Sequence, residues 1–367
     1  MYYHHHDTAR AHLVIFYRNF QLKPVAGKGS APHSHIGLGV SAMHTAKVLR
    51  REHIRTDVFG VWLAKDIENR LEELGSSVTH AIIEAPWVGL KEMENLLYRF
   101  PHVHFIVRSH SQVGFLQVEA GAVQLLRDYS LLEDSTLNFS IAANSQRFCE
   151  FMEIAYRVNC LYLPNLYDFE RAQRHDYRIH KSGETLKIGS FGAIRLLKNH
   201  STAAAAALML ARLRDSNLEF YMNVNREEHG NGVLHAIRNL FKDLPWAKLI
   251  EVPWQPWGSF RQTVGHMNIC FQVSATETFN IVTADAAAEG VPSVIGESID
   301  WLPREWVANI DDAQDIARIA NHLLSDPRAG RKATHALEVY TCNATKVWLD
   351  WLNNKKSGCS QKLRIIL

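Results

Sequence analysis

The sequence predicts an α/β protein built from two Rossmann-like domains, and three observations carry that prediction. The chain has 367 residues, more than one hydrophobic core usually supports. Short apolar runs alternate with amphipathic helical patterns along most of its length. A polar stretch at residues 168–185 interrupts this alternation once and is predicted to be an interdomain linker. Continuous apolar strands separated by helices are typical of a parallel sheet covered on both faces.

The first half of the chain is predicted to form an N-terminal domain over residues 1–167. Its first strand is the apolar run H-L-V-I-F-Y at residues 12–17. A loop rich in Gly, Pro and Ser follows, and then a helix with apolar residues at every third or fourth position. Further strands are predicted at residues 57–62, 81–83, 103–107, 138–142 and 161–165.

The second half repeats the pattern and is predicted to form a C-terminal domain over residues 186–340. Strands are predicted at residues 186–189, 219–224, 248–252, 268–273 and 292–295. Helices are predicted near residues 202–213, 232–241, 279–288 and 313–324. Residues 341–367 are predicted to be a closing helix and tail. Two such domains place a cleft where the carboxyl ends of both sheets face each other.

The composition is that of an ordinary soluble protein, with 47% hydrophobic and 21% charged residues. The formal net charge of +2 does not by itself indicate nucleic-acid binding. The five cysteines contain no C-x-x-C pair, which favours reduced thiols. No apolar run reaches the roughly 18 residues of a membrane span, and the N-terminus lacks a signal-peptide pattern. These features predict a soluble, cytoplasmic protein without a transmembrane segment.

Two carboxylates occupy the most informative segment, S-A-T-E-T-F-N-I-V-T-A-D-A-A-A-E-G-V-P-S-V at residues 274–294. Glu277 follows the end of a predicted strand, and Asp285 comes eight residues later on the next helix. A rise of 1.5 Å per helical residue separates them by about 12 Å. One carboxylate could therefore bind sugar hydroxyls while the other binds ribose hydroxyls across a diphosphate.

The helix in this segment is predicted to begin near Thr278. Backbone N–H groups at a helix start form a positive terminus that suits a diphosphate. The residues predicted to supply this donor-binding terminus are Thr278, Phe279, Asn280 and Ile281.

A glycine-bearing turn, G-S-F-G-A-I-R-L-L-K-N, follows the first strand of the second domain at residues 189–199. Gly192 lies in the turn, and Arg195 and Lys198 follow it. Cations are needed at such a place because a departing nucleoside diphosphate develops negative charge. These residues are predicted to hold the diphosphate.

Together, the two segments resemble the retaining glycosyltransferases of GT-B fold, the family that includes glycogen and sucrose synthases. That family has a Glu, seven residues, a second Glu, and then Gly-Val-Pro. This chain has Asp285 in place of the second Glu, and Asn280 where a Gly usually follows the Phe. It also lacks the family arginine near Gly192, and Arg195 is the substitute that the resemblance suggests. The resemblance implies that Glu277 binds the sugar and Asp285 the ribose.

In the first domain, V-R-S-H places His110 just past a strand end. It resembles the family histidine that contacts the transferred sugar. Gly37 matches one position of the family's Gly-Gly loop, and His35 beside it is a candidate for recruitment of the acceptor. The run V-P-W-Q-P-W-G at residues 252–258 is open to two interpretations, contact with the nucleotide base or core packing.

The resemblance implies transfer of a sugar from a nucleoside diphosphate sugar, with UDP the expected nucleotide, to a hydroxyl acceptor. It implies retention of anomeric configuration. The sequence has no D-x-D triplet, so we expect transfer without a metal and without a cofactor other than the donor. The pairs His33/His35 and His102/His104 lack the Cys or carboxylate that would complete a metal site.

The acceptor stays open. Lys47, Arg50 and Arg51 cluster on the first predicted helix. Such clusters are usually solvated helix faces, but this one could recruit an anionic acceptor such as a lipid or DNA with a hydroxylated base. Glycans and small molecules are the other options. Rival functions are a degenerate GT-B module that binds without turnover, a nucleotide-sugar epimerase, and an oxidoreductase, for which no G-x-G-x-x-G turn follows the first strand.

Overall fold

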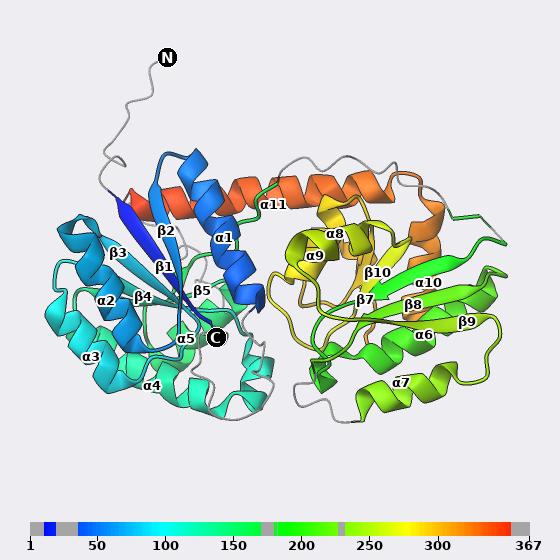
Figure 1. The fold of residues 1–367 in the computed structure, drawn as a ribbon, viewed down its shortest axis with the longest axis horizontal. Helices are drawn as coiled ribbons and strands as arrows, with labels where there is room; N and C mark the ends of the chain where they lie inside the picture. The colour runs from blue at the N-terminus through cyan, green and yellow to red at the C-terminus, as the bar shows by residue number, and fades with distance from the viewer. Residues whose placement is uncertain (1–10, 20–35, 170–179, 182, 227–231, 354–367) are drawn as a thin grey trace, which may run out of the picture.

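The computed structural model describes residues 11–19, 36–169, 180–181, 183–226 and 232–353. Figure 1 shows two lobes side by side, each built on one sheet with helices packed around it. A long helix, α11, runs along one side of both lobes. The prediction of an α/β protein with two parallel sheets is confirmed.

The first sheet has six parallel strands in the order β2-β1-β3-β4-β5-β6. Leu13 and Phe16 on the interior strand β1 are completely buried, because helices cover both faces of the sheet. The strands are β1 His12–Arg18, β2 Arg55–Val61, β3 His80–Glu84, β4 His104–Ser109, β5 Phe139–Ala143 and β6 Leu161–Tyr162. The helices are α1 Ile36–Arg51, α2 Ala64–Leu74, α3 Leu90–Arg99, α4 Ala120–Ser135 and α5 Gln146–Tyr156, with short 3₁₀ turns η3 Gly75–Ser77 and η4 Val113–Val118.

The second sheet has five parallel strands in the order β11-β10-β7-β8-β9. A run of small residues on α6, Ala203 to Ala207, lets this helix lie close against the sheet. The strands are β7 Leu186–Ser190, β8 Leu218–Asn223, β9 Ala247–Val252, β10 Ile269–Gln272 and β11 Ser293–Ile295. The helices are α6 His200–Leu213, α7 Val233–Phe241, α8 Trp257–Gly265, α9 Ile281–Ala288 and α10 Ala313–Ser325, with 3₁₀ turns η5 Leu196–Lys198 and η6 Arg304–Trp306.

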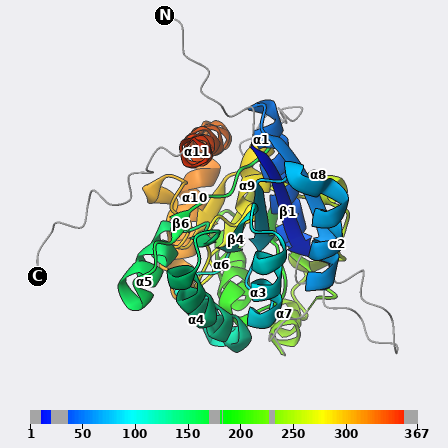
Figure 2. The ribbon, with the colours of Figure 1, turned by 90° about the vertical axis from the view of Figure 1, so that its left-hand side faces the viewer.

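Helix α11, Ala329–Leu352, connects the cores of the two domains. Its first half places Leu337 in the core of the second domain, and its second half places Trp348 in the core of the first. Figure 2 shows the helix end-on, on one side of the strands. The closing helix was predicted to begin at residue 341, but it begins at Ala329, because apolar residues at helical spacing continue upstream of that boundary.

Helix α9 begins later than its sequence pattern predicts. The first helical residue is Ile281 rather than Thr278 or Phe279. Asn280 is the N-cap residue, with a φ of 54°, and its side-chain oxygen accepts the N–H of Thr283 at 2.9 Å. Asparagine tolerates this backbone conformation, and its side chain caps the helix. The loop therefore ends at Asn280, and the helix begins at the next residue.

Some predictions lie outside the described residues. These are His35, His33, and residues 170–179 and 182 of the predicted linker. The domain boundaries at 167 and 185 therefore stay predictions. Within the described residues, no helix is both long enough and apolar enough to span a bilayer.

Candidate functional site between the two domains

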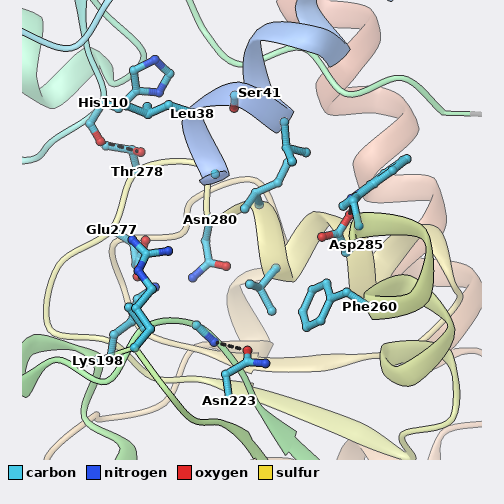
Figure 3. Close-up of a pocket in the computed structure, with 18 of the residues that line it drawn as sticks. Leu38, Ser41, His110, Lys198, Asn223, Phe260, Glu277, Thr278, Asn280 and Asp285 are labelled. Atoms are coloured by element: carbon cyan, nitrogen blue, oxygen red, sulfur yellow. Dashed lines mark hydrogen bonds and ion pairs between the residues drawn. The ribbon is translucent and has the colours of Figure 1, made fainter. Parts of the chain in front are cut away.

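A cavity of about 260 Å³ lies between the two domains, at the carboxyl ends of their strands. Every residue predicted to be catalytic or donor-binding lines it, except Phe279. Figure 3 shows Glu277 and Lys198 on one side of the cavity, Asp285 on the opposite side, and Asn280 between them. Two motifs about 80 residues apart in the sequence therefore meet at one site, as the resemblance implies.

Glu277 and Lys198 form an ion pair at the cavity wall. Both side chains are largely buried, with 14% and 15% of their surfaces exposed. The turn before Lys198 favours glycine, since Gly192 has a φ of 122°, a backbone conformation that other residues rarely adopt. The Gly192 N–H donates to Oδ1 of Asn223 at 3.0 Å, which fixes the turn against the end of β8.

Two arginines add positive charge to the same cavity. The Arg195 guanidinium lies 4.9 Å from the ring centroid of Phe115, which belongs to the other domain. Arg226 is buried, and its guanidinium lies 4.8 Å from the ring centroid of Trp254. Among the residues that the structure describes, no three His, Cys, Asp or Glu side chains gather as a metal-binding group.

Asp285 is almost completely buried, and one of its oxygens is held by two donors. Oδ1 accepts the Tyr167 hydroxyl at 2.7 Å and Nε1–H of Trp257 at 3.0 Å. Both hydrogen bonds end at the same oxygen, Oδ1, so neither of these two donors occupies Oδ2. Burial raises the pKa of Asp285 to about 7, against the lowering effect of the Tyr167 and Trp257 hydrogen bonds and of Arg261.

The raised pKa predicts a pH-dependent stability. A carboxyl whose pKa is higher in the folded state stabilises most at low pH, and this contribution is lost as the pH rises through about 7. In an Asp285→Asn variant, the fall in unfolding free energy between pH 5 and pH 8 should be smaller by about 2–3 kcal/mol. Urea unfolding at both pH values measures it, with the exposed Asp311→Asn as the matched control. Equal pH dependence in Asp285→Asn and in the unchanged protein would contradict the prediction.

His110 lies where the first domain meets the second. Its backbone carbonyl accepts the Thr278 hydroxyl at 3.2 Å, and the same Thr278 oxygen accepts Nδ2–H of Asn144 at 2.9 Å. Figure 3 shows His110 above Thr278 at one end of the cavity. Because Thr278 directly follows Glu277, these hydrogen bonds connect the loop that carries Glu277 to the opposite domain.

Two of the predicted groups lie away from the cavity. The Phe279 ring is buried in the core of the second domain, stacked on Tyr340 with centroids 4.9 Å apart. The Lys47 ammonium lies 3.2 Å from Oδ2 of Asp168, and Arg51 lies 2.5 Å from Oδ1 of the same buried carboxylate. Arg50 donates through Nε to the Thr56 carbonyl at 2.7 Å. Acceptor recruitment by this cluster stays a prediction.

Several cavity residues escaped the sequence analysis. Asn144 directly follows β5, and Arg226 comes three residues after β8. Both positions follow the carboxyl end of a parallel strand, where side chains of neighbouring strands converge. A polar residue just after a predicted strand was thus the sequence signal that could have identified these cavity residues. Ser41, Asn165, Trp254 and Trp257 also line the cavity, so the tryptophans of the V-P-W-Q-P-W-G run contact the site.

No protein-family model matches the chain, and no curated protein matches its sequence. Solved structures match it closely in shape. Sucrose-phosphate synthase from Thermosynechococcus elongatus superposes with a TM-score of 0.67 at 14% identity, over 93% of this chain and 98% of that one. The fold is GT-B. The structural match therefore agrees with the GT-B fold that the sequence resemblance implied.

Two further structures share the fold. A UDP-forming α,α-trehalose-phosphate synthase from Burkholderia xenovorans has a TM-score of 0.59 at 12% identity, over 94% of this chain and 99% of its own. A TarM variant from S. aureus, in complex with UDP, has a TM-score of 0.56 at 12% identity. That match covers 78% of this chain but only 58% of TarM, so this chain spans little more than half of TarM's length. At such identities the likeness concerns the fold.

Proposed function

We propose that this GT-B protein is a glycosyltransferase that moves a sugar from a nucleoside diphosphate sugar to a hydroxyl acceptor. The observation that supports it most is the meeting of Glu277, Lys198 and His110 around one cavity between the domains. A carboxylate, a cation and an imidazole at one cleft suit a ligand that carries both hydroxyl groups and phosphates.

Glu277 and Lys198 would bind different parts of the donor, the sugar and the diphosphate. A carboxylate only accepts hydrogen bonds, so Glu277 binds hydroxyl groups of the sugar. An ammonium group has three protons, and the pair with Glu277 occupies one of them. The other two remain for the diphosphate, and the ion pair holds Lys198 at the cavity wall before the donor arrives.

The leaving group acquires its charge as the bond between the anomeric carbon and the phosphate oxygen breaks. A new bond forms between that carbon and the acceptor oxygen, and the proton of the acceptor hydroxyl passes to an oxygen of the departing diphosphate or to solvent. Arg195 and the start of α9 at Ile281 would stabilise the departing diphosphate together with Lys198. Domain closure would keep water from the reactive donor.

Asp285 would bind the ribose. Tyr167 and Trp257 both donate to Oδ1, and Oδ2 would accept the ribose hydroxyls. The aromatic residues Trp254 and Trp257 also line the cavity and would contact the base.

UDP is the first nucleotide to test. The TarM structure contains UDP, and the trehalose-phosphate synthase is described as UDP-forming. Retention, which the resemblance implies, would be read from the anomeric configuration of the product by NMR. The acceptor class follows only from a screen of glycans, small molecules, anionic lipids and hydroxylated DNA.

A thermal-shift screen with UDP, GDP, ADP, dTDP and their sugar conjugates tests the proposal. A ligand at a hundred times its dissociation constant adds about 2.7 kcal/mol of stability. We expect one nucleotide and its conjugates to stabilise the protein, and a Glu277→Ala, Asp285→Ala double variant to lose the effect. Glu297→Ala is the matched control, because Glu297 is an exposed carboxylate that pairs with the exposed Arg304. Stabilisation by none of these ligands would contradict the proposed function and favour a degenerate module.

A further inference from the structure

A completely buried ion pair lies directly behind His110. Glu84, the last residue of β3, is paired in register with Arg108 of β4, and neither side chain is exposed to solvent. NH1 of Arg108 donates to Oε1 of Glu84 at 2.7 Å. The other Arg108 nitrogens donate to the Leu163 carbonyl at 2.9 Å and to Oδ1 of Asn165 at 2.7 Å. A buried ion pair seldom stabilises more than apolar residues of equal volume, so its place beside the cavity calls for another explanation.

The second oxygen of Glu84 contacts His110. Oε2 of Glu84 lies 2.5 Å from Nε2 of the imidazole. Burial alone would raise the pKa of Glu84, but Arg108 and His110 outweigh it and hold that pKa below its ordinary value. Burial lowers the pKa of His110, against the opposing effect of Glu84. An ionised carboxylate therefore faces a neutral imidazole, and since a carboxylate only accepts, the single ring proton is on Nε2.

The other ring nitrogen, Nδ1, is then an acceptor with a weak partner. Nδ2 of Asn144 lies 3.3 Å from it. The same Nδ2 lies 3.1 Å from Oδ1 of Asn165 and 2.9 Å from Oγ1 of Thr278. An amide group has two hydrogens and cannot serve three acceptors. The longest contact is the one to Nδ1, so this nitrogen is the acceptor that a ligand hydroxyl can take over.

We propose that Glu84 is a positioning residue, which keeps the proton of His110 on Nε2 and so presents the Nδ1 lone pair to a hydroxyl group of the donor sugar. This inference rests on the proposed function for the identity of the ligand. When the sugar hydroxyl donates to Nδ1, both Asn144 hydrogens are released to Asn165 and Thr278. Sugar binding thereby strengthens the contact between the domains beside Glu277.

A Glu84→Gln variant tests the proton position. Arg108 donates through NH1, so it holds the new amide oxygen on its own side and leaves the NH₂ group facing Nε2 of His110. Nε2 must then accept, and the ring proton moves to Nδ1. We expect ¹⁵N NMR of the imidazole, assigned with a His110→Gln variant, to show protonated Nε2 in the unchanged protein and protonated Nδ1 in Glu84→Gln.

The same variant tests the role in binding. Its affinity for UDP-glucose should fall about tenfold, the cost of one hydrogen bond, while its affinity for UDP stays unchanged. Glu68→Gln is the matched control, because Glu68 is also a buried carboxylate paired with an arginine, Arg99, but lies on α2 away from the cavity. We expect it to leave both affinities unchanged.

Two results would overturn the inference. One is an Nδ1 proton on His110 in the unchanged protein. The other is an equal loss of UDP and UDP-glucose affinity in Glu84→Gln, which would mean a general structural role for Glu84. If neither ligand nor any other nucleotide binds the unchanged protein, the proposed function fails, and the ring proton, measured without ligand, still decides the role of Glu84.

Discussion

Under the proposed function, a Lys198→Ala variant should transfer sugar about 10²–10³ times more slowly than the unchanged protein, because removal of one group that stabilises charge in a transition state has this cost. Lys198 is the cation paired with Glu277, and only 15% of its side chain is exposed. Its loss would remove a charge from the diphosphate and also leave the Glu277 carboxylate without its ion-pair partner. Initial rates at saturating donor measure the effect on kcat.

Lys187→Ala is the matched control for this variant. Lys187 is a half-exposed lysine on β7, and its ammonium lies 3.9 Å from Glu219, outside the cavity. We expect its kcat to equal that of the unchanged protein. A Lys198→Ala enzyme with undiminished kcat would show that Lys198 takes no part in neutralising the leaving group, and would leave that role to Arg195 and the start of α9.

The sheets were predictable because their strands are buried on both faces. Runs such as Leu13 to Phe16 are completely buried, and burial on both faces produces a continuous apolar run that needs no knowledge of the partner strands. The start of α9 was less predictable. The sequence around Thr278 permits a helix, and only the left-handed φ of Asn280, together with its cap on Thr283, places the first helical residue at Ile281.

The cavity was predictable where its residues form short motifs. Glu277, Asp285 and Lys198 lie in two such motifs, and all three line the cavity. Glu84 and Asn144 belong to no motif, because their partners lie far away in the sequence. His110 follows Glu84 by 26 residues, and Thr278 follows Asn144 by 134. The charge cluster on α1 illustrates the same limit. Lys47 and Arg51 are basic and close together in sequence, but their partner Asp168 lies more than a hundred residues further along the chain.

A Trp348→Ala variant should lose about 3–5 kcal/mol of unfolding free energy, the range found when a buried Trp or Phe is truncated. Trp348 is completely buried in the core of the first domain, and its Nε1–H donates to the Pro164 carbonyl at 2.8 Å. The Arg108 guanidinium lies 5.3 Å from its ring centroid. Truncation would therefore open a cavity, leave a carbonyl without its donor, and remove the ring beneath the ion pair of Glu84.

Val339→Ala on the same helix is the control, because Val339 is 46% exposed and should change the stability by less than about 0.5 kcal/mol. Urea unfolding followed by tryptophan fluorescence and by circular dichroism measures both variants. Since α11 packs on both cores, a destabilised Trp348 end should weaken the first domain and detach it from the second, so the two probes should report separate transitions in Trp348→Ala. A loss below about 1 kcal/mol with a single transition would mean that the second half of α11 is not needed to hold the domains together.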